Sequence, residues 1–330
     1  MVDMYKIFIL DVALLNTFLA AADTDYVNAI IGKGNSHLLI NQAEVFNVLD
    51  LKTITTEPDC HVRIPKVILA KLIRSGSIEL RISDGIVEMK LLDENENCYC
   101  TAKFLKQDFP VNDYKFKMEV IRNLSDEAKI DLAQFESLEK LMRTTKSILN
   151  VSDGVAMIVA TNGRVYKEVS SNYKFAVTQF AYSLLKRCSE IVYNVDNFLI
   201  AQKNGLTVIV NKCKSFSNSE YTLFTEQKAS VVCGIGLTDL KYFLNKMHSD
   251  NSNIKLNLQN RTSHFNLGTI SYEVPIEVSD LKGVPNADYT VSIPESIVRE
   301  VLFSIETKGA TLAKKRTFTQ IRIKNLLIVF

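Results

Sequence analysis

Hydrophobic and polar positions follow the same order in two distant stretches of the chain. Residues 62–74 read as a short extended run, a proline and a helix whose apolar residues are spaced at i, i+1, i+4 and i+5 from Ile68. Residues 291–302 repeat this order. Proline suits a first helical turn because its missing N–H has no helical partner. Three strands are predicted after the first helix, so the repeated unit is β-α-β-β-β.

This unit can be followed six times along the sequence. The copies begin near residues 5, 62, 129, 175, 230 and 289. Two longer connectors separate pairs of copies, a predicted extended strand over residues 114–122 and a linker over residues 216–228. Asn204-Gly205 predicts a two-residue hairpin turn within the fourth copy. The pattern therefore predicts an α+β protein of three domains with two units each: residues 1–120, 121–228 and 229–330.

The composition is typical of a globular protein. The 330 residues are 47% hydrophobic and 23% charged, with a formal net charge of +2. Any affinity for nucleic acid must therefore come from the placement of basic residues and not from their excess. No apolar run approaches the roughly 20 residues of a membrane span. We expect a cytoplasmic protein without a membrane partner.

The residues that usually carry catalysis are scattered. Six cysteines lie apart without a CxxC pair, and the four histidines are far from one another. The sequence has no glycine-rich phosphate loop and no paired carboxylates at strand ends. Asp84-Gly85 and Asp153-Gly154 are interpreted as hairpin turns. We therefore predict no enzyme, no disulfide, no metal and no cofactor.

Five of the six predicted helices carry cations beside their apolar residues. The first helix has none, and Glu136, Glu139, Glu295 and Glu300 dilute others. Taken alone, such residues are most often the solvated faces of amphipathic helices. The cations in question are Lys66, Lys71, Arg74, Lys140, Arg143, Lys146, Lys186, Arg187, Lys241, Lys246 and Arg299.

Two local motifs and the repeat together resemble the bacterial β-type DNA polymerase sliding clamps over essentially the whole chain. Residues 159–165 are similar to the segment V-A-T-D-G-H-R-L of that family's middle domain, with Asn162 for Asp and one residue fewer before the apolar position. Phe104 and the turn Asp108-Phe109-Pro110 resemble the end of the family's first domain, although the intervening segment is shorter. Agreement of order, spacing and repeat count supports the resemblance.

The resemblance implies a clamp fold with helices inside and sheets outside a ring. Such a ring is a DNA polymerase processivity factor that encircles double-stranded DNA without sequence specificity. The implied partners are DNA, a DNA polymerase and a clamp loader. Family rings contain twelve units, so a chain of six units implies a homodimer. The cations named above would then face the DNA phosphates.

The resemblance also implies an apolar cleft for partner peptides and a subunit interface. The implied cleft residues are Leu149, Thr161, Gly163, Arg164, Val165, Leu327, Ile328, Val329 and Phe330. The implied interface residues are Phe104 and Met247. A plain buried last strand explains residues 327–330 equally well, and turn chemistry alone explains Thr161 and Gly163.

A second reading keeps the fold without the ring. The helix without cations and the glutamates on other helices are compatible with a monomeric, ring-less processivity factor or a scaffold. The mass of the protein in solution separates these two alternatives.

Overall fold

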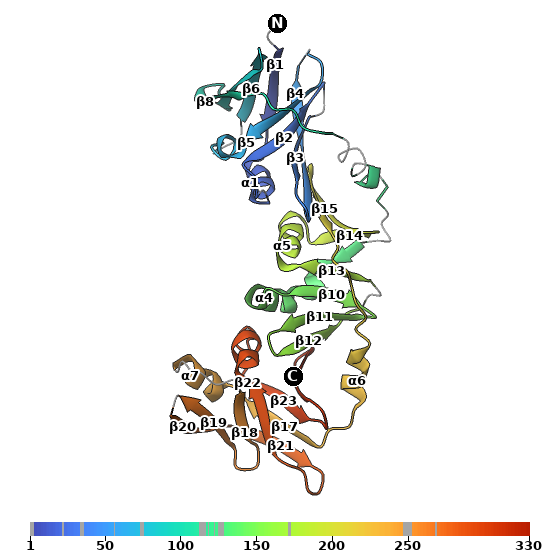
Figure 1. Cartoon of the computed structure of the whole chain (residues 1–330), viewed down its shortest axis with the longest axis vertical. Helices are drawn as coiled ribbons and strands as arrows, with labels where there is room; N and C mark the ends of the chain where they lie inside the picture. The colour runs from blue at the N-terminus through green and yellow to red at the C-terminus, as the bar shows by residue number, and fades with distance from the viewer. Residues whose placement is uncertain are drawn as a thin grey trace. The chain divides into compact units, whose positions relative to one another are not determined.

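The computed structural model describes residues 3–21, 23–33, 36–55, 57–72, 76–111, 117, 119–121, 123–124, 129–170, 173–246, 253–267 and 269–330. The chain forms two compact units, Met1–Leu132 with Phe180–Lys212 and Ala133–Gln179 with Cys213–Phe330. A strand, a helix and three strands follow one another six times (Figure 1), which confirms the α+β class and the predicted repeat. The division into three domains stays a prediction.

The first unit contains a 12-stranded sheet. Its order is β8-β7-β6-β1-β4-β16-β15-β14-β9, and β2, β3 and β5 branch from this path. The strands are β1 (Asp3–Ile9), β2 (Tyr26–Ile31), β3 (Ser36–Asn41), β4 (Val45–Ile54), β5 (Cys60–Pro65), β6 (Gly76–Ser83), β7 (Ile86–Asp93), β8 (Cys98–Leu105), β9 (Lys129–Asp131), β14 (Ile191–Val195), β15 (Phe198–Lys203) and β16 (Leu206–Asn211).

The strands of this unit show the alternation that a half-buried sheet requires. In β1, Tyr5, Ile7 and Ile9 are buried, whereas the residues between them are not. The predicted hairpin at Asn204-Gly205 joins β15 and β16, and both residues have positive φ, 50° and 85°. A two-residue turn of this hand matches the twist of the strands, which is why Asn-Gly favours it.

The helices of the first unit include α1 (Val12–Ala20), α2 (Lys66–Leu69) and, from Phe180 onward, α5 (Gln179–Cys188). Asp11 caps α1 by accepting a hydrogen bond from the Leu14 N–H at 3.1 Å. The prediction that the second helix continues to Arg74 is wrong as far as the described residues go. The N–H groups of Lys71 and Leu72 bond to carbonyls only three residues back, which tightens and ends the helix at Leu69. Arg74 itself lies outside the described residues.

The prediction of an extended strand over residues 114–122 is also wrong where the chain is described. Residues 117 and 119–121 are helical. Val120, Ile121 and Leu124 pack against a buried cluster that includes Phe46 and Ile209. Their spacing of i, i+1 and i+4 is helical, and this outweighs the alternation that favoured a strand.

The second unit contains a nine-stranded and a four-stranded sheet. The nine-stranded order is β13-β10-β11-β12-β25-β24-β23-β17-β21, and the four-stranded order is β20-β19-β18-β22. The strands are β10 (Ile148–Ser152), β11 (Val155–Ala160), β12 (Gly163–Glu168), β13 (Phe175–Thr178), β17 (Val231–Gly236), β18 (Asn253–Asn257), β19 (Thr262–Leu267), β20 (Ile270–Pro275), β21 (Val278–Gly283), β22 (Thr290–Pro294), β23 (Gly309–Lys314), β24 (Thr319–Ile323) and β25 (Leu326–Val329).

The helices of this unit are, from Ala133 onward, the 3-10 helix η2 (Leu132–Phe135), then α4 (Glu136–Thr145), α6 (Glu220–Glu226), α7 (Thr238–Lys246) and the π-helix η3 (Ile297–Leu302). The helix α4 buries Leu138, Leu141 and Met142. Full burial of such side chains stabilises the fold by about 1.5–3 kcal/mol each. The linker predicted over residues 216–228 thus contains a helix, α6. The strands β20 and β21 follow each other closely along the chain but belong to different sheets.

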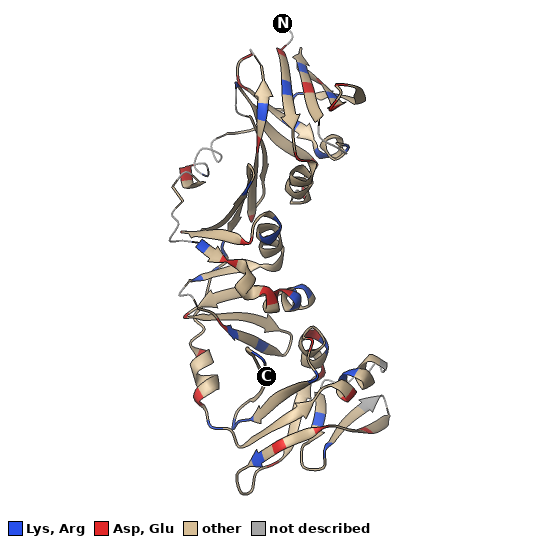
Figure 2. Ribbon diagram, turned by 180° about the vertical axis from the view of Figure 1, so that it is seen from behind, with Lys and Arg blue, Asp and Glu red and all other residues tan. Residues whose placement is uncertain are grey.

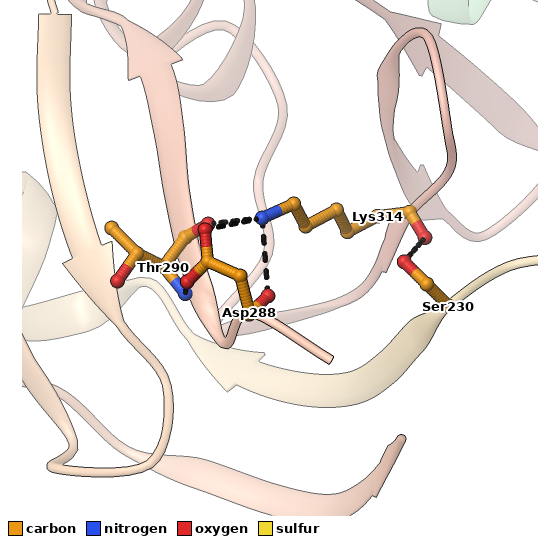
Figure 3. Close-up of polar contacts among 4 residues, drawn as sticks. All are labelled: Ser230, Asp288, Thr290 and Lys314. Carbon is orange, nitrogen blue, oxygen red and sulfur yellow. Dashed lines mark hydrogen bonds and ion pairs between the residues drawn. The ribbon is translucent and has the colours of Figure 1, made fainter. Parts of the chain in front are cut away.

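Lys314 on β23 connects the two sheets of this unit (Figure 3). Its Nζ donates to the carbonyl oxygens of Asp288 and Thr290, at 3.1 and 2.8 Å, and to the Asp288 carboxylate at 3.0 Å. Ser230 Oγ donates to the Lys314 carbonyl at 3.0 Å. Because β22 begins at Thr290, this one side chain fixes the start of a strand in the four-stranded sheet.

Replacing Lys314 with methionine is expected to lower the free energy of unfolding by about 1–2 kcal/mol, because two backbone carbonyls lose a charged donor. The Thr290 N–H and Lys314 hold the pKa of Asp288 below its usual value. Since a depressed carboxyl pKa stabilises the fold only while the group is ionised, this contribution is present above a pH of about 4 and is lost as the pH falls through the depressed pKa. Urea unfolding at several pH values measures both effects.

The matched control is Lys282→Met, at an exposed position of β21. We expect Lys282→Met to change the unfolding free energy little at any pH. Equal losses in the two variants, or a loss for Lys314→Met that grows at acid pH, would contradict the role given to Lys314.

Candidate functional site

The predicted cations of the first unit lie on or just after its helices. Lys66 is the first residue of α2 and is half-buried, whereas Lys71 follows the helix and is exposed. Lys186 and Arg187 lie in the last turn of α5, where a cation interacts favourably with the helix dipole. The first helix, α1, has neither acidic residues in its first turn nor basic residues in its last turn.

In the second unit, acidic partners accompany the cations. Arg143 on α4 pairs with Glu139 at 2.5 Å, and Arg299 on η3 pairs with Glu295 at 2.6 Å, both across one helical turn. Lys140 lies 3.7 Å from Glu306, and Lys146 is exposed at the end of α4. Figure 2 shows both signs of charge on α4. The basic face of this unit is therefore partly neutralised.

The side chain of Lys241 forms hydrogen bonds to the backbone of its own unit. Its Nζ donates to the carbonyls of Ile305 and Thr307, at 3.0 and 3.2 Å. Burial lowers the pKa of Lys241 from its usual value. Lys241 thus binds the chain that follows η3. The side chain of Lys246, at the end of α7, lies outside the described part.

The segment that resembles the clamp motif lies at the join of two strands distant in sequence. β12 pairs with β25, with Arg164 opposite Val329 and Tyr166 opposite Leu327. Because successive side chains of a strand point to opposite faces, the residues of β12 and β25 are divided between the two faces of the sheet. Arg164, Tyr166, Leu327 and Val329 share the face on which α6 packs, which we call the outer face. In Figure 1, α4 and α6 lie on opposite sides of strands β10–β12.

The structure does not bring all the predicted cleft residues to the outer face. Leu149, Val165 and Ile328 lie on the opposite face and are 0% exposed. Arg164, Leu327 and Val329 lie on the outer face, and Thr161 and Gly163 lie in the turn before or at the start of β12. Phe330 is half-buried, and a Cβ built on Gly163 would lie 3.4 Å from the Phe330 Cβ.

The apolar cluster on the outer face, where α6 packs on β12 and β25, is called the aromatic groove below. Its buried members are Val155, Met157, Tyr166, Leu327 and Val329. Tyr221 and Phe224 of α6 and Phe318 pack against them while remaining only partly buried. The ring centroids of Tyr166 lie 5.7 Å from both Tyr221 and Phe224, and those of Phe224 and Phe318 are 4.9 Å apart with an edge-to-face geometry.

Polar groups border this aromatic groove. Arg164 forms an ion pair with Glu220, and the Tyr221 hydroxyl donates to Glu168 at 2.7 Å. Burial and the Glu168 carboxylate raise the pKa of Tyr221 to about 12. Burial also raises the pKa of Tyr166, and the neighbouring Arg164 guanidinium opposes part of that change. These groups surround apolar surface with a charged border, as interaction sites commonly do.

A buried polar cluster anchors the start of α6. The Asn218 side chain accepts from Asn150 Nδ2 at 2.9 Å and donates to the Val155 carbonyl at 2.7 Å. The Asn218 N–H donates to Ser152 Oγ and to Asp153, each at 3.1 Å. Hydrogen bonds from Ser152, Ser217 and the Asn218 N–H lower the pKa of Asp153. At the other end of α6, Lys315 Nζ donates to the Phe224 carbonyl at 2.5 Å.

The sequence interpretation missed Tyr166, Tyr221, Phe224, Phe318 and Asn218. The spacing of Tyr221 and Phe224 at i and i+3 is a helical signal that could have identified α6. Nothing local marks Asn218, because its partners lie more than 60 residues away along the chain.

The predicted interface residues are placed only in part. Phe104 lies on β8, at one end of the 12-stranded sheet, where it is half-buried and opposite Val87. Met247 lies outside the described residues. In the described part of the chain, no three His, Cys, Asp or Glu side chains gather as a metal site would require. None of its helices is long and apolar enough to cross a membrane.

Comparison with known proteins gives one clear result. No family model matches the sequence, and no curated protein matches it. Solved structures do match. A DNA polymerase III β subunit structure from Eubacterium rectale has a TM-score of 0.71 at 11% identity, covering 99% of this chain and 98% of that one. The β subunit from the DNA polymerase of Streptococcus pyogenes has a TM-score of 0.70 at 11% identity, with the same coverage.

A third structure, the DNA polymerase III subunit β from Pseudomonas aeruginosa, has a TM-score of 0.67 at 14% identity and covers 98% of both chains. At such low identity the likeness shows the fold and not the activity. The agreement nevertheless extends over nearly the whole length of each protein. The chain therefore has the fold of the DNA polymerase III β subunit, as the sequence resemblance predicted.

Proposed function

We propose that this chain is the subunit of a sliding clamp, a DNA polymerase processivity factor that encircles duplex DNA without reading its sequence. One observation carries the proposal: the likeness to DNA polymerase III β subunits covers 98–99% of this chain and 98% of theirs. Fold alone does not fix function. The aromatic groove, the charges on the helices and the exposed strand edges add support from this chain's own residues.

Weak, sequence-independent contacts would hold the DNA. Lys71, Lys140, Arg143, Lys146 and Arg187 are exposed on or beside helices, with long flexible side chains suited to phosphate contacts. The Glu139 and Glu295 partners reduce the attraction of nearby arginines, and the net charge of the chain is only +2. Such a surface would let DNA slide. The protein would stay on DNA because it encloses it, with no catalytic step of its own.

Two strand edges support assembly into a homodimeric ring. β8 ends the 12-stranded sheet and β20 ends the four-stranded sheet. Every residue of both strands is exposed or half-buried. Unpaired edges of this kind promote association unless they are covered. Pairing β8 of one chain with β20 of the partner subunit would cover both, and Lys103 and Glu273 give these edges opposite charges.

The aromatic groove is the proposed docking site for peptides of the polymerase and the clamp loader. Tyr166, Leu327 and Val329 form its buried base. The partly buried Tyr221, Phe224 and Phe318 would present the apolar surface that a peptide contacts. Thr161, Gly163, Arg164 and Phe330 would border it, while Leu149, Val165 and Ile328 support the strands from the opposite face. Partly buried aromatic side chains of this kind favour a peptide that offers apolar side chains to pack against them. We place the protein in the cytoplasm with the replication machinery.

The proposal is tested by loading the protein onto nicked circular DNA with a clamp loader and then cutting the circle. An enclosing ring should remain on the circle through gel filtration at moderate salt and leave after the cut, because linear DNA has free ends. Equal retention on circular and linear DNA would contradict enclosure. A strict monomer that still stimulates the polymerase would favour the ring-less processivity factor. The pairing of Arg143 and Arg299 with glutamates is compatible with that alternative.

A further inference from the structure

Two residues of the turn that leads into β12 are hydrogen-bonded to η3 or to Ser296, the residue just before it. The Thr161 N–H and Oγ1 donate to the Glu300 carboxylate at 3.2 and 2.5 Å, each to a different oxygen. Asn162 Nδ2 donates to Ser296 Oγ at 2.8 Å. Thr161 and Asn162 are exposed, so these hydrogen bonds lie at the surface beside the aromatic groove.

Gly163 brings the same turn into close contact with its surroundings. A Cβ built on Gly163 would lie 2.7 Å from Ile297 Cδ1 and 2.7 Å from the Val329 carbonyl oxygen. No larger residue fits there without displacing the backbone of β25 or the side chain from η3. The start of β12 therefore lies directly against η3 and β25.

Glu300 is itself fixed within η3. Its carbonyl accepts from Ser304 Oγ at 2.8 Å and from Thr144 Oγ1 of α4 at 3.3 Å. The Phe303 N–H donates to the Val298 carbonyl five residues back, the bond that defines a π-turn. π-turns are rare and occur frequently at functional sites. The Glu300 carboxylate thus projects from a segment that is held on two sides.

We propose that Glu300 is a positioning residue for peptide binding in the aromatic groove, which rests on the proposed function of that groove. By holding Thr161, Glu300 sets where β12 begins. Arg164 and Tyr166 follow within five residues, one pairing with Glu220 and the other forming the floor of the groove. A displaced turn would move both side chains relative to α6.

The substitution Glu300→Gln tests this with little change in shape. A carboxylate offers an acceptor oxygen to each of the two Thr161 donors, whereas an amide offers one oxygen and places an NH₂ group against the other donor. We expect the substitution to weaken peptide binding about tenfold, because charge-assisted hydrogen bonds are roughly twice as strong as neutral ones. Thr161→Val, which replaces the hydroxyl with a methyl group, should weaken binding less than Glu300→Gln does. Thr161→Ser, which keeps the hydroxyl, should bind the peptide as the unsubstituted protein does.

The probe is a fluorescein-labelled hexapeptide with two leucines and one phenylalanine, and its dissociation constant is measured by fluorescence anisotropy with the full-length chain. Hydrogen exchange of the Thr161 N–H, which should be faster in Glu300→Gln, reports the turn without any peptide. The control is Glu306→Gln, which removes a carboxylate whose side chain is 92% exposed and lies 3.7 Å from Lys140. Thermal unfolding checks that each variant is folded.

The outcomes separate this inference from the function on which it rests. If the unsubstituted protein and Glu300→Gln bind the probe equally well, Glu300 does not position the residues of the aromatic groove. The groove itself then remains the proposed peptide site. If the unsubstituted protein does not bind the probe, the groove is not a peptide site and the inference falls with it. Tenfold weaker binding by Glu300→Gln, with Glu306→Gln unchanged and Thr161→Ser close to the unsubstituted protein, supports it.

Discussion

Replacing Asn218 with alanine is expected to lower the free energy of unfolding by about 2–3 kcal/mol and to weaken peptide binding at least tenfold. Asn218 is 3% exposed, and its side chain bonds to Asn150 and to the Val155 carbonyl. Alanine would remove this hydrogen-bond partner from the Asn150 side chain and the Val155 carbonyl. An unsatisfied buried polar group costs more free energy than its hydrogen bond contributes to stability. The start of α6 would also lose its anchor, so Tyr221 and Phe224 would no longer be held against Tyr166.

Urea unfolding and anisotropy with the fluorescent hexapeptide measure the two effects. Ser219→Ala is the matched control, because Ser219 is exposed and its side chain makes no capping hydrogen bond to α6. The control should behave as the unsubstituted protein does. A stable Asn218→Ala protein that binds the peptide normally would show that α6 keeps its place without this polar cluster.

Replacing Phe104 with aspartate is expected to convert the proposed homodimer into a monomer at micromolar concentration. Phe104 is half-buried at the free edge of β8, on the same face of the sheet as the buried Val87 opposite it. A partner subunit would bury it further, and a carboxylate buried there without a cation would cost several kcal/mol. A two-fold ring contains this contact twice, so both interfaces should fail. Size-exclusion chromatography with light scattering measures the mass.

The neighbouring position provides the control. Leu105 points to the other face of β8 and is already 72% exposed, so Leu105→Asp should leave the mass at twice that of one chain. Circular dichroism checks that both variants retain the fold. A Phe104→Asp protein that remains dimeric would remove β8 from the interface. A monomeric unsubstituted protein would support the ring-less alternative.

The repeat could be predicted because each of its elements has a strong local signal. Helix α4 separates Leu138 and Leu141 from Lys140 and Arg143 on a 3.6-residue period, and the Asn204-Gly205 turn has a specific geometry. These signals depend only on neighbouring residues. The recognition of six copies of one unit then predicted the fold, although each segment that resembled the clamp family was only a few residues long.

The face on which each strand residue lies was harder to predict, because side chains alternate between the two faces of a sheet. The sequence matched the family motif with one residue fewer before the apolar position, which put Val165 in the cleft. In the structure Val165 is buried on the face opposite α6, and Tyr166 lies on the outer face. The assignment of Val165 to the cleft stays a prediction. A shift of one residue moves every side chain of a strand to the other face. No local property of the sequence reveals such a shift.

Lys241 shows the same limit for a helix. Its position beside Leu240 and Leu244 predicted a solvated cation, yet its Nζ binds carbonyls at residues 305 and 307. Those acceptors lie far along the chain, so the amphipathic pattern could not reveal them. Asn218 was missed for the same reason.

The pairing of β12 with β25 has a consequence for biosynthesis. β25 follows β12 only after many intervening elements, so β12 leaves the ribosome long before its neighbour exists. About 160 residues separate Arg164 from its partner Val329, and at about 5–20 residues per second the nascent chain would wait on the order of 10–30 s. During that interval Tyr166 and the open backbone of β12 would be exposed to other nascent chains. The β12 edge would therefore need protection from association until residues 326–329 are synthesised and pair with it.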